Sequence, residues 1–150
     1  MTMTLAQLTQ RTGLDVLDHL ERQVAIPVVA GLQAQGDLIV IPFDLVDEAQ
    51  LSTAAQWLAV PAAGIELLRS AGGGNPHTLV ADPGTCEWTT DVIDPEHLAL
   101  GVLRTRQPAY LIHPEHGGSG IATGTYLVRR QRERVNRPRL ATSGVQLVAD

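Results

Sequence analysis

Short apolar segments, separated by glycine and proline turns, make up most of this chain. The clearest is Gly36-Asp37-Leu38-Ile39-Val40-Ile41-Pro42-Phe43, in which two turn-forming residues precede a β-branched run. Such a run is typical of a β-strand. From residue 64 onward the same pattern recurs, and it predicts further strands over residues 65–68, 77–81, 86–89, 97–103, 109–113, 125–130 and 145–148.

Helical spacing of apolar residues is confined to two segments. Over residues 4–24, leucine and valine recur every three or four positions, which predicts one helix, or two short helices broken near Gly13. Residues 47–59 also carry an apolar face at helical spacing. Asp47 and Glu48 lie near the start of that second segment, where negative charge stabilises a helix.

Together these elements predict a mainly β (α+β) fold. Short strands with glycine and proline between them are typical of a small antiparallel barrel or sandwich rather than of alternating strands and helices. We therefore expect an N-terminal helical extension over residues 1–30 and a β-rich domain over residues 31–150.

Composition narrows the class of protein further. A chain of 150 residues, 44% of them hydrophobic, is long enough to bury one core without disulfides. No apolar run approaches the roughly 18 residues that a membrane span requires, and the first thirty residues do not resemble a secretory signal. Cys86 is the sole cysteine, and it lies in an apolar strand without a basic neighbour, so we interpret it as a core thiol. These features favour a cytoplasmic protein.

Charge is distributed unevenly along the chain. Residues 1–128 contain 5 arginines and 14 acidic residues, a net charge of −9, whereas residues 129–150 contain 6 arginines and 2 acidic residues, a net charge of +4. The two parts sum to the overall −5, and the chain contains no lysine. The C-terminal part therefore reverses the charge of an acidic body.

The six C-terminal arginines are the first candidate binding residues. They are Arg129, Arg130, Arg132, Arg134, Arg137 and Arg139. Guanidinium groups suit ion pairs at interfaces, so a basic segment on an acidic body favours a homo-oligomer or a protein partner. Nucleic acid is a second possible partner because several arginines can neutralise phosphates, and a merely solvated face is a third interpretation. Aromatic residues make up only 3% of the chain, which disfavours stacking on single strands.

Three histidines are candidate metal ligands. His113 and His116 flank Pro114-Glu115 in a predicted turn, and His77 opens the strand that follows a glycine-rich turn. Three protein ligands with an open position would suit zinc, and two histidines with a carboxylate would suit iron. The alternative is that the histidines cap turns through backbone hydrogen bonds. We favour this second interpretation of the histidines, and we therefore expect no cofactor.

Several of these motifs together resemble a family of small uncharacterised bacterial and phage proteins. The resemblance spans roughly residues 35–135 and includes Gln35-Gly36-Asp37, His113-Pro114-Glu115-His116 and Gly124-Thr125-Tyr126-Leu127-Val128-Arg129-Arg130-Gln131-Arg132-Glu133. The glycine turn of that family carries a Gly-His-x-His pair, whereas this chain has Gly74-Asn75-Pro76-His77 and so only one of the two histidines. The resemblance implies no known activity.

A looser likeness, at the level of fold alone, is to cupins. A histidine after a glycine turn fits that outline, but the His-x-His and the following Glu of cupins are absent. We therefore expect a non-catalytic binding or assembly module that self-associates or docks a partner through its arginine-rich C-terminal strand. The alternatives are a metal-dependent, cupin-like enzyme that uses His77, His113 and His116, and a nucleic-acid-binding protein that uses the arginines.

Overall fold

A computed structural model describes residues 3–16, 25–69, 75–134 and 145–147 of the chain. The first sheet has five strands in the order β1 (Val28–Val29), β12 (Gly117–Ile121), β11 (Ala109–His113), β7 (Pro76–Val80) and β6 (Ile65–Arg69). The second has six strands in the order β2 (Gln33–Gln35), β3 (Leu38–Pro42), β13 (Gly124–Arg130), β10 (Ala99–Thr105), β8 (Cys86–Thr89) and β5 (Leu58–Ala59). The remaining elements are helix α1 (Leu5–Thr12), the 3₁₀ helix η1 (Phe43–Leu45), the strand pair β4 (Gln50–Leu51) and β9 (Val92–Ile93), and the strand pair β14 (Arg132–Arg134) and β15 (Val145–Leu147).

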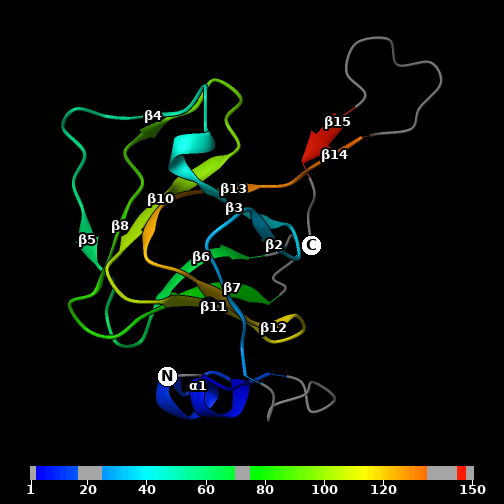
Figure 1. The fold of residues 1–150 in the computed structure, drawn as a ribbon. Helices are drawn as coiled ribbons and strands as arrows, with labels where there is room; N and C mark the ends of the chain where they lie inside the picture. Colours follow the sequence, from blue (N-terminus) through cyan, green and yellow to red (C-terminus); the bar gives the residue numbers. More distant parts are fainter. Residues whose placement is uncertain (1–2, 17–24, 70–74, 135–144, 148–150) are drawn as a thin grey trace.

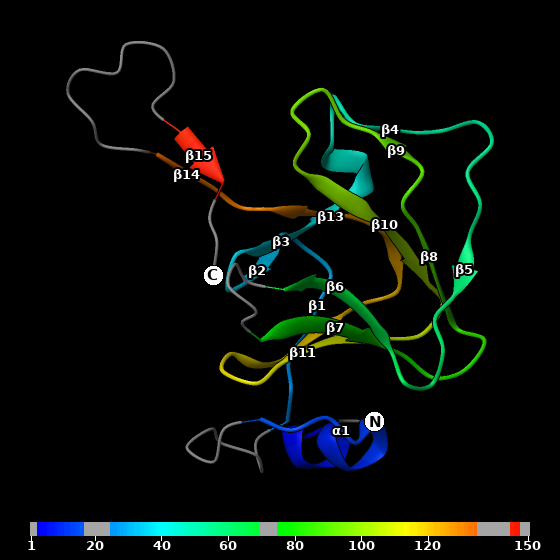
Figure 2. The same ribbon diagram turned by 180° about the vertical axis from the view of Figure 1, so that it is seen from behind.

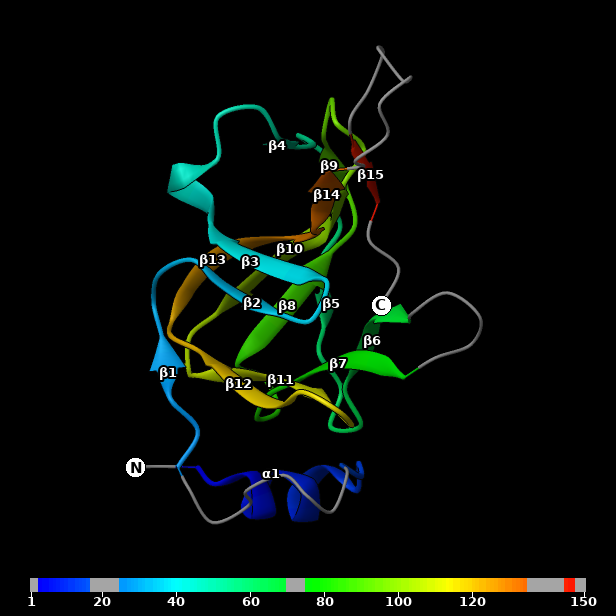
Figure 3. The same ribbon diagram turned by 90° about the vertical axis from the view of Figure 1, so that its right-hand side faces the viewer.

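The two large sheets pack face to face as an open sandwich (Figures 1 and 2). Seen from the side, α1 lies against the outer face of the five-stranded sheet, and the six-stranded sheet lies beyond its inner face (Figure 3). The mainly β fold with an N-terminal helix is thus confirmed, and among the described strands no sheet closes into a barrel. No helix in the described residues is long and apolar enough to span a bilayer.

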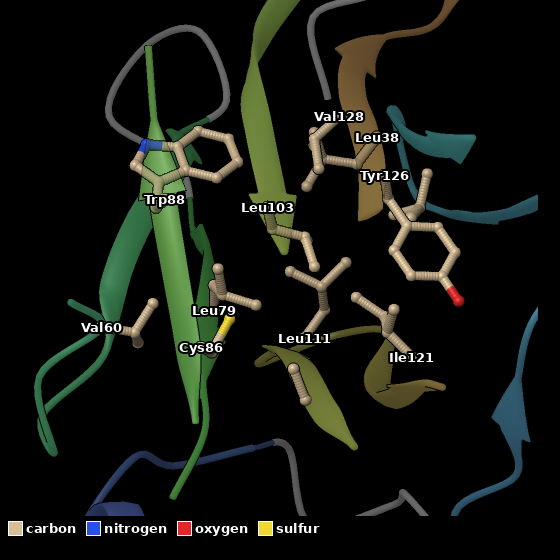
Figure 4. Packing of buried hydrophobic residues seen from close by; sticks show 12 residues of the cluster. Leu38, Val60, Leu79, Cys86, Trp88, Leu103, Leu111, Ile121, Tyr126 and Val128 are labelled. Carbon is tan, nitrogen blue, oxygen red and sulfur yellow. The ribbon is translucent and has the colours of Figure 1, made fainter. Parts of the chain in front are cut away.

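Apolar side chains from both sheets fill the space between them (Figure 4). Leu79 and Leu111 of the five-stranded sheet meet Leu103 and Val128 of the six-stranded sheet, and all four are fully buried. Cys86 lies in the same core at 2% exposure, so it is the core thiol that the sequence indicates.

Each sheet also buries part of its outer face. Helix α1 covers Val80, Tyr110 and Ile112 of the five-stranded sheet. Residues 43–57 cover Val102 and Leu127 of the six-stranded sheet. This burial on both faces explains why β11 and the middle of β13 are continuously apolar instead of alternating with polar residues.

The N-terminal helix is shorter than the periodicity predicts. It begins after Thr4, whose side chain accepts a hydrogen bond from the Gln7 N–H while the Gln7 side chain accepts one from the Thr4 N–H. It ends at Gly13, which adopts the left-handed conformation with φ of 74°. The break near Gly13 is therefore confirmed, whereas residues 17–24 of the predicted segment lie outside the described residues.

The helix predicted over residues 47–59 is wrong. The segment instead contributes β4, which pairs with β9, and β5, which pairs with β8 at the edge of the six-stranded sheet. Its apolar residues Leu51 and Trp57 pack onto the outer face of that sheet. Backbone pairing with distant strands thus outweighs the local helical spacing of the apolar residues.

Strand prediction succeeds for the longer apolar strands, and it misses the glycine-rich β12 and the two-residue strands β1, β4, β5 and β9. The ranges 86–89 and 109–113 match β8 and β11 residue for residue. Strand β12 was not predicted, because Gly117-Gly118-Ser119-Gly120 resembles a loop. A Cβ at Gly120 would lie 2.6 Å from the carbonyl oxygen of Pro27, and glycine here lets β1 run alongside β12.

Candidate functional site

A two-residue turn places two polar side chains inside the sandwich. Gln35 ends β2 and pairs with Leu38 of β3, so Gly36 and Asp37 form the connecting loop. Gly36 has a φ of 58° and Asp37 does not have a positive φ, which matches a type II′ hairpin turn. Gln35 and Asp37 are 4% and 3% exposed, so both polar groups need hydrogen-bond partners within the protein.

His77 supplies a partner for each of these side chains. It lies on β7 of the opposite sheet and is 1% exposed. Its Nδ1 is 2.9 Å from Oε1 of Gln35, and its Nε2 is 3.0 Å from Oδ1 of Asp37. The pair of hydrogen bonds joins the two sheets at one end of the sandwich.

The amide of Gln35 determines which nitrogen of His77 carries a proton. Gln35 Nε2 donates to the carbonyl oxygen of Leu111 at 3.0 Å and lies 3.0 Å from Oγ of Ser119. Because a carbonyl can only accept, the amide oxygen of Gln35 must face His77, and Nδ1 of His77 must donate to it. The hydrogen bond between Nε2 of His77 and the carboxyl group of Asp37 then holds a second proton, which the two groups share.

His113 holds the loop that follows it. Its Nδ1 accepts hydrogen bonds from the backbone N–H groups of Glu115 and His116, at 3.1 and 3.2 Å. The loop ends at Gly117, whose φ of 80° suits glycine. His113 is 1% exposed, whereas His116 is exposed to solvent. Glu115 in the same loop accepts a hydrogen bond from Asn75 at 2.9 Å, which ties the loop to the start of β7.

The three imidazole rings lie in contact as a stack, here called the histidine stack (His77, His113 and His116). The ring centroids of His77 and His113 are 4.3 Å apart, and those of His113 and His116 are 4.5 Å apart. His77 and His116 lie 6.2 Å apart with nearly parallel rings. The structure therefore brings together the three histidines that the sequence singles out. The stack runs from His77, which contacts the buried Asp37, to His116 at the surface.

The orientation of the rings limits what the histidine stack can bind. A metal ion needs a lone pair on each ligand nitrogen, and both nitrogens of His77 face Gln35 and Asp37. Nδ1 of His113 faces two backbone N–H groups. Within the described residues, no group of three or more His, Cys, Asp or Glu side chains is arranged to hold a metal ion. In this arrangement two of the histidines act as hydrogen-bonding groups of the fold, and metal binding stays a prediction.

Four of the six candidate arginines lie in the described residues, in two different strands. Arg129 and Arg130 end β13, and pairing with β3 stops at Arg130. The chain then leaves the six-stranded sheet, and Arg132 and Arg134 lie in β14. Arg137 and Arg139 lie outside the described residues.

A hollow lined by carboxylates adjoins the end of β13. It has a volume of about 240 Å³, and its polar lining residues are Asp47, Glu48, Asp94, Glu96 and Arg129. Nη1 of Arg129 lies 3.5 Å from Oε1 of Glu96. We call this region, defined by the four acidic residues, the acidic hollow.

Asp94 lines the acidic hollow and accepts hydrogen bonds from the turn beside it. Partial burial raises the pKa of its carboxyl group. Hydrogen bonds from the backbone N–H groups of Ala99, Glu96 and Leu98, and the positive charge of Arg129, lower the pKa. These lowering effects are together larger than the effect of burial, so the pKa lies below its ordinary value. Asp94 is thus ionised and engaged with the turn before β10, whereas Asp47, Glu48 and Glu96 are exposed.

Comparison with protein families gives a match over most of the described chain. Residues 34–131 match a family described as a domain of unknown function, DUF8820. The chain belongs to the DUF8820 family. No curated protein and no solved structure matches it. The DUF8820 region contains the histidine stack with Gln35 and Asp37, whereas α1, β1, β14 and β15 lie outside it.

Sequence reasoning identified the histidines of this DUF8820 member but missed their partners. Gln35 and Asp37 belong to the Gln-Gly-Asp motif of the family resemblance, and from sequence alone that motif predicts only a turn before a strand. The sequence does carry a signal for these partners. It is the pair of polar residues on either side of a turn glycine, directly before an apolar strand.

Proposed function

We propose that this DUF8820 protein is a non-catalytic assembly module that self-associates through its arginine-rich C-terminal strand, β14. The observation that carries the proposal is the course of the chain after β13. Strand β14 leaves the six-stranded sheet, pairs with β15 in a separate two-stranded sheet, and projects away from the sandwich (Figures 1 and 2). We call β14 and β15 the basic ribbon.

The isolation of the basic ribbon supports a docking role. A lone two-stranded ribbon is at best marginally stable in water, so it gains stability by packing against another surface. The chain places Arg132 and Arg134 in this ribbon, directly after Arg129 and Arg130. These arginines belong to a segment of net charge +4 attached to a body of net charge −9.

The acidic hollow provides a surface of opposite charge. Asp47 and Glu48 are exposed and make no ion pair with any described residue. Arg129 and Glu96 already form an arginine–carboxylate contact at the edge of the hollow within one chain. We infer that a second copy of the chain presents its basic ribbon to the acidic hollow of the first. Arginine forms such interface ion pairs readily.

The histidine stack favours a binding module over a metal enzyme. His77 and His113 use their ring nitrogens in hydrogen bonds that join the sheets and hold a hairpin loop. These ring nitrogens stabilise the fold through their hydrogen bonds. In a catalytic site, the ring nitrogens would have to face a substrate instead.

Size-exclusion chromatography with light scattering tests the proposal. We expect the intact chain to form a dimer or a larger oligomer, and we expect the double variant Arg132→Ser/Arg134→Ser to be a monomer. The matched control, Arg104→Ser/Arg106→Ser, removes the same charge from exposed positions elsewhere and should leave the oligomer intact. A wild-type chain that stays monomeric at high concentration contradicts the proposal.

A charge exchange identifies the two surfaces. Asp47→Arg/Glu48→Arg and Arg132→Glu/Arg134→Glu should each be monomeric alone, whereas their mixture should form a heterodimer. Absence of the heterodimer would rule out the pairing of ribbon and hollow. If the wild type is a monomer that binds duplex DNA with an affinity that falls steeply with salt, the nucleic-acid function holds instead.

A further inference from the structure

A cavity lies between helix α1 and the outer face of the five-stranded sheet. Its volume is about 450 Å³, within the range of small-molecule sites. Most of its lining is apolar and comes from α1, from β7 and from the loop before β11. Its polar lining residues are Arg11, Thr12, Asp82, Gln107 and Tyr110.

Tyr110 contributes a polar group to this cavity. Its side chain is 8% exposed, and its hydroxyl makes no hydrogen bond with any residue in the described part of the chain. The hydroxyl oxygen itself is not fully buried, so it is open to a ligand in the cavity. Burial raises the pKa of Tyr110, the charge of Asp82 raises it further, and Arg11 lowers it, so the net change is upward. The hydroxyl is therefore a protonated donor.

A charged pair lies at the edge of the same cavity. Arg11, in the last turn of α1, donates a hydrogen bond to Asp82, and both side chains are about half exposed. A guanidinium has five N–H donors, so Arg11 can keep Asp82 and still donate to a second acceptor. Arg11 and Tyr110 thus offer two donors beside an apolar space.

We propose that this cavity binds a small apolar monocarboxylate. The carboxylate accepts hydrogen bonds from Tyr110 and Arg11, and the hydrocarbon part lies against Leu8 and Val80. A carboxylate fits because Arg11 and Tyr110 both donate, and hydrogen bonds to an ionised acceptor are the stronger kind. The Asp82 carboxylate in the same lining is engaged by Arg11. The site belongs to this chain and not to the DUF8820 region alone, because Met3, Leu8, Arg11 and Thr12 precede the matched residues 34–131.

Titration of the full chain with octanoate, followed by calorimetry, tests the site directly. We expect octanoate to bind at one site and 1-octanol, which has the same hydrocarbon length and no charge, to bind more weakly. Tyr110→Phe should weaken octanoate binding about tenfold, because it removes one hydrogen bond to a charged group. It should leave thermal stability nearly unchanged, because the hydroxyl has no hydrogen-bond partner among the described residues.

Two further variants separate this site from nonspecific binding. Ala62→Trp fills the cavity from an exposed position and should abolish binding, whereas Ala63→Trp, also exposed but not part of the lining, should not. Arg11→Met should remove the preference for octanoate over 1-octanol. Equal binding of both compounds by the wild type, or unchanged binding by Ala62→Trp, overturns the proposal. So does the absence of octanoate binding at millimolar concentration.

Discussion

Asp37 and His77 come from opposite sheets of the sandwich, and their side chains meet with Oδ1 of Asp37 3.0 Å from Nε2 of His77. Both side chains are almost completely buried. A buried acceptor and donor at this distance link the sheets far more specifically than apolar packing does, because each group loses its partner if the sheets shift.

Asp37→Asn should therefore destabilise the protein. We expect a loss of about 1–3 kcal/mol in the free energy of unfolding, because the amide cannot share the proton of the pair as the carboxyl group does. Urea unfolding followed by tryptophan fluorescence measures this loss. Asp44→Asn is the control, since Asp44 is exposed. Equal stability of the two variants would show that the contact contributes nothing.

The double variant Asp37→Asn/His77→Gln should cost less than the sum of its single substitutions. Residues that share one hydrogen bond have coupling energies of roughly 0.5–3 kcal/mol. Additive losses would show that Asp37 and His77 act independently.

Metal content is the second testable feature of the histidine stack. Because both nitrogens of His77 are hydrogen-bonded, we expect protein purified without chelator or histidine tag to contain less than one zinc or iron per chain. Elemental analysis by mass spectrometry measures it. A stoichiometric metal that is lost in His77→Gln and retained in His97→Gln would contradict this expectation, since His97 is exposed and lies outside the stack.

Local sequence predicted the histidine loop but not the contact with Asp37. His113 and His116 are close in the chain, and a proline between them indicates a turn. His77 and Asp37 are 40 residues apart and belong to different sheets, so their contact depends on how the sheets pack. No periodicity in a single sequence encodes that packing.

The same distinction explains the successes and failures in the fold. Strand β11 was predictable because its five residues are all buried and mostly apolar. The segment 47–59 was not, because Leu51 and Leu58 suit either a helix face or two separate short strands. Pairing of Leu51 with Val92 and of Leu58 with Trp88 decides in favour of strands, and both contacts are long-range.

Gly101 in the middle of β10 should tolerate no side chain. A Cβ at this position would lie 2.4 Å from Cζ2 of Trp88 and 2.5 Å from the carbonyl oxygen of Thr89. Gly101→Ala should thus destabilise the fold by about 1–3 kcal/mol through overpacking. Gly31→Ala is the matched control, because a Cβ there would meet nothing within 4 Å. Thermal unfolding of the two variants checks the difference, and similar melting temperatures would contradict the packing of β10 against β8.

Alkaline pH should destabilise the protein through Cys86. Burial raises the pKa of its thiol from 9.0 to about 11, despite a hydrogen bond with Thr105 that lowers it. Between these two values the unfolded thiol loses its proton while the folded thiol keeps it, so the free energy of unfolding falls as the pH rises. This difference in pKa corresponds to a contribution of roughly 2–3 kcal/mol to the free energy of unfolding. The full contribution is present below pH 9 and is lost as the pH rises to about 11.

Cys86→Ala isolates this contribution. The substitution should lower stability at neutral pH by leaving a small cavity, but the variant should lose less stability than the wild type between pH 9 and pH 11. Urea unfolding at several pH values measures both slopes. Since the thiolate is the reactive form, the native thiol should also react slowly with a disulfide reagent at pH 8 and quickly in denaturant. Equal alkaline slopes for the two proteins, or rapid reaction of the native thiol, would contradict the buried position of Cys86.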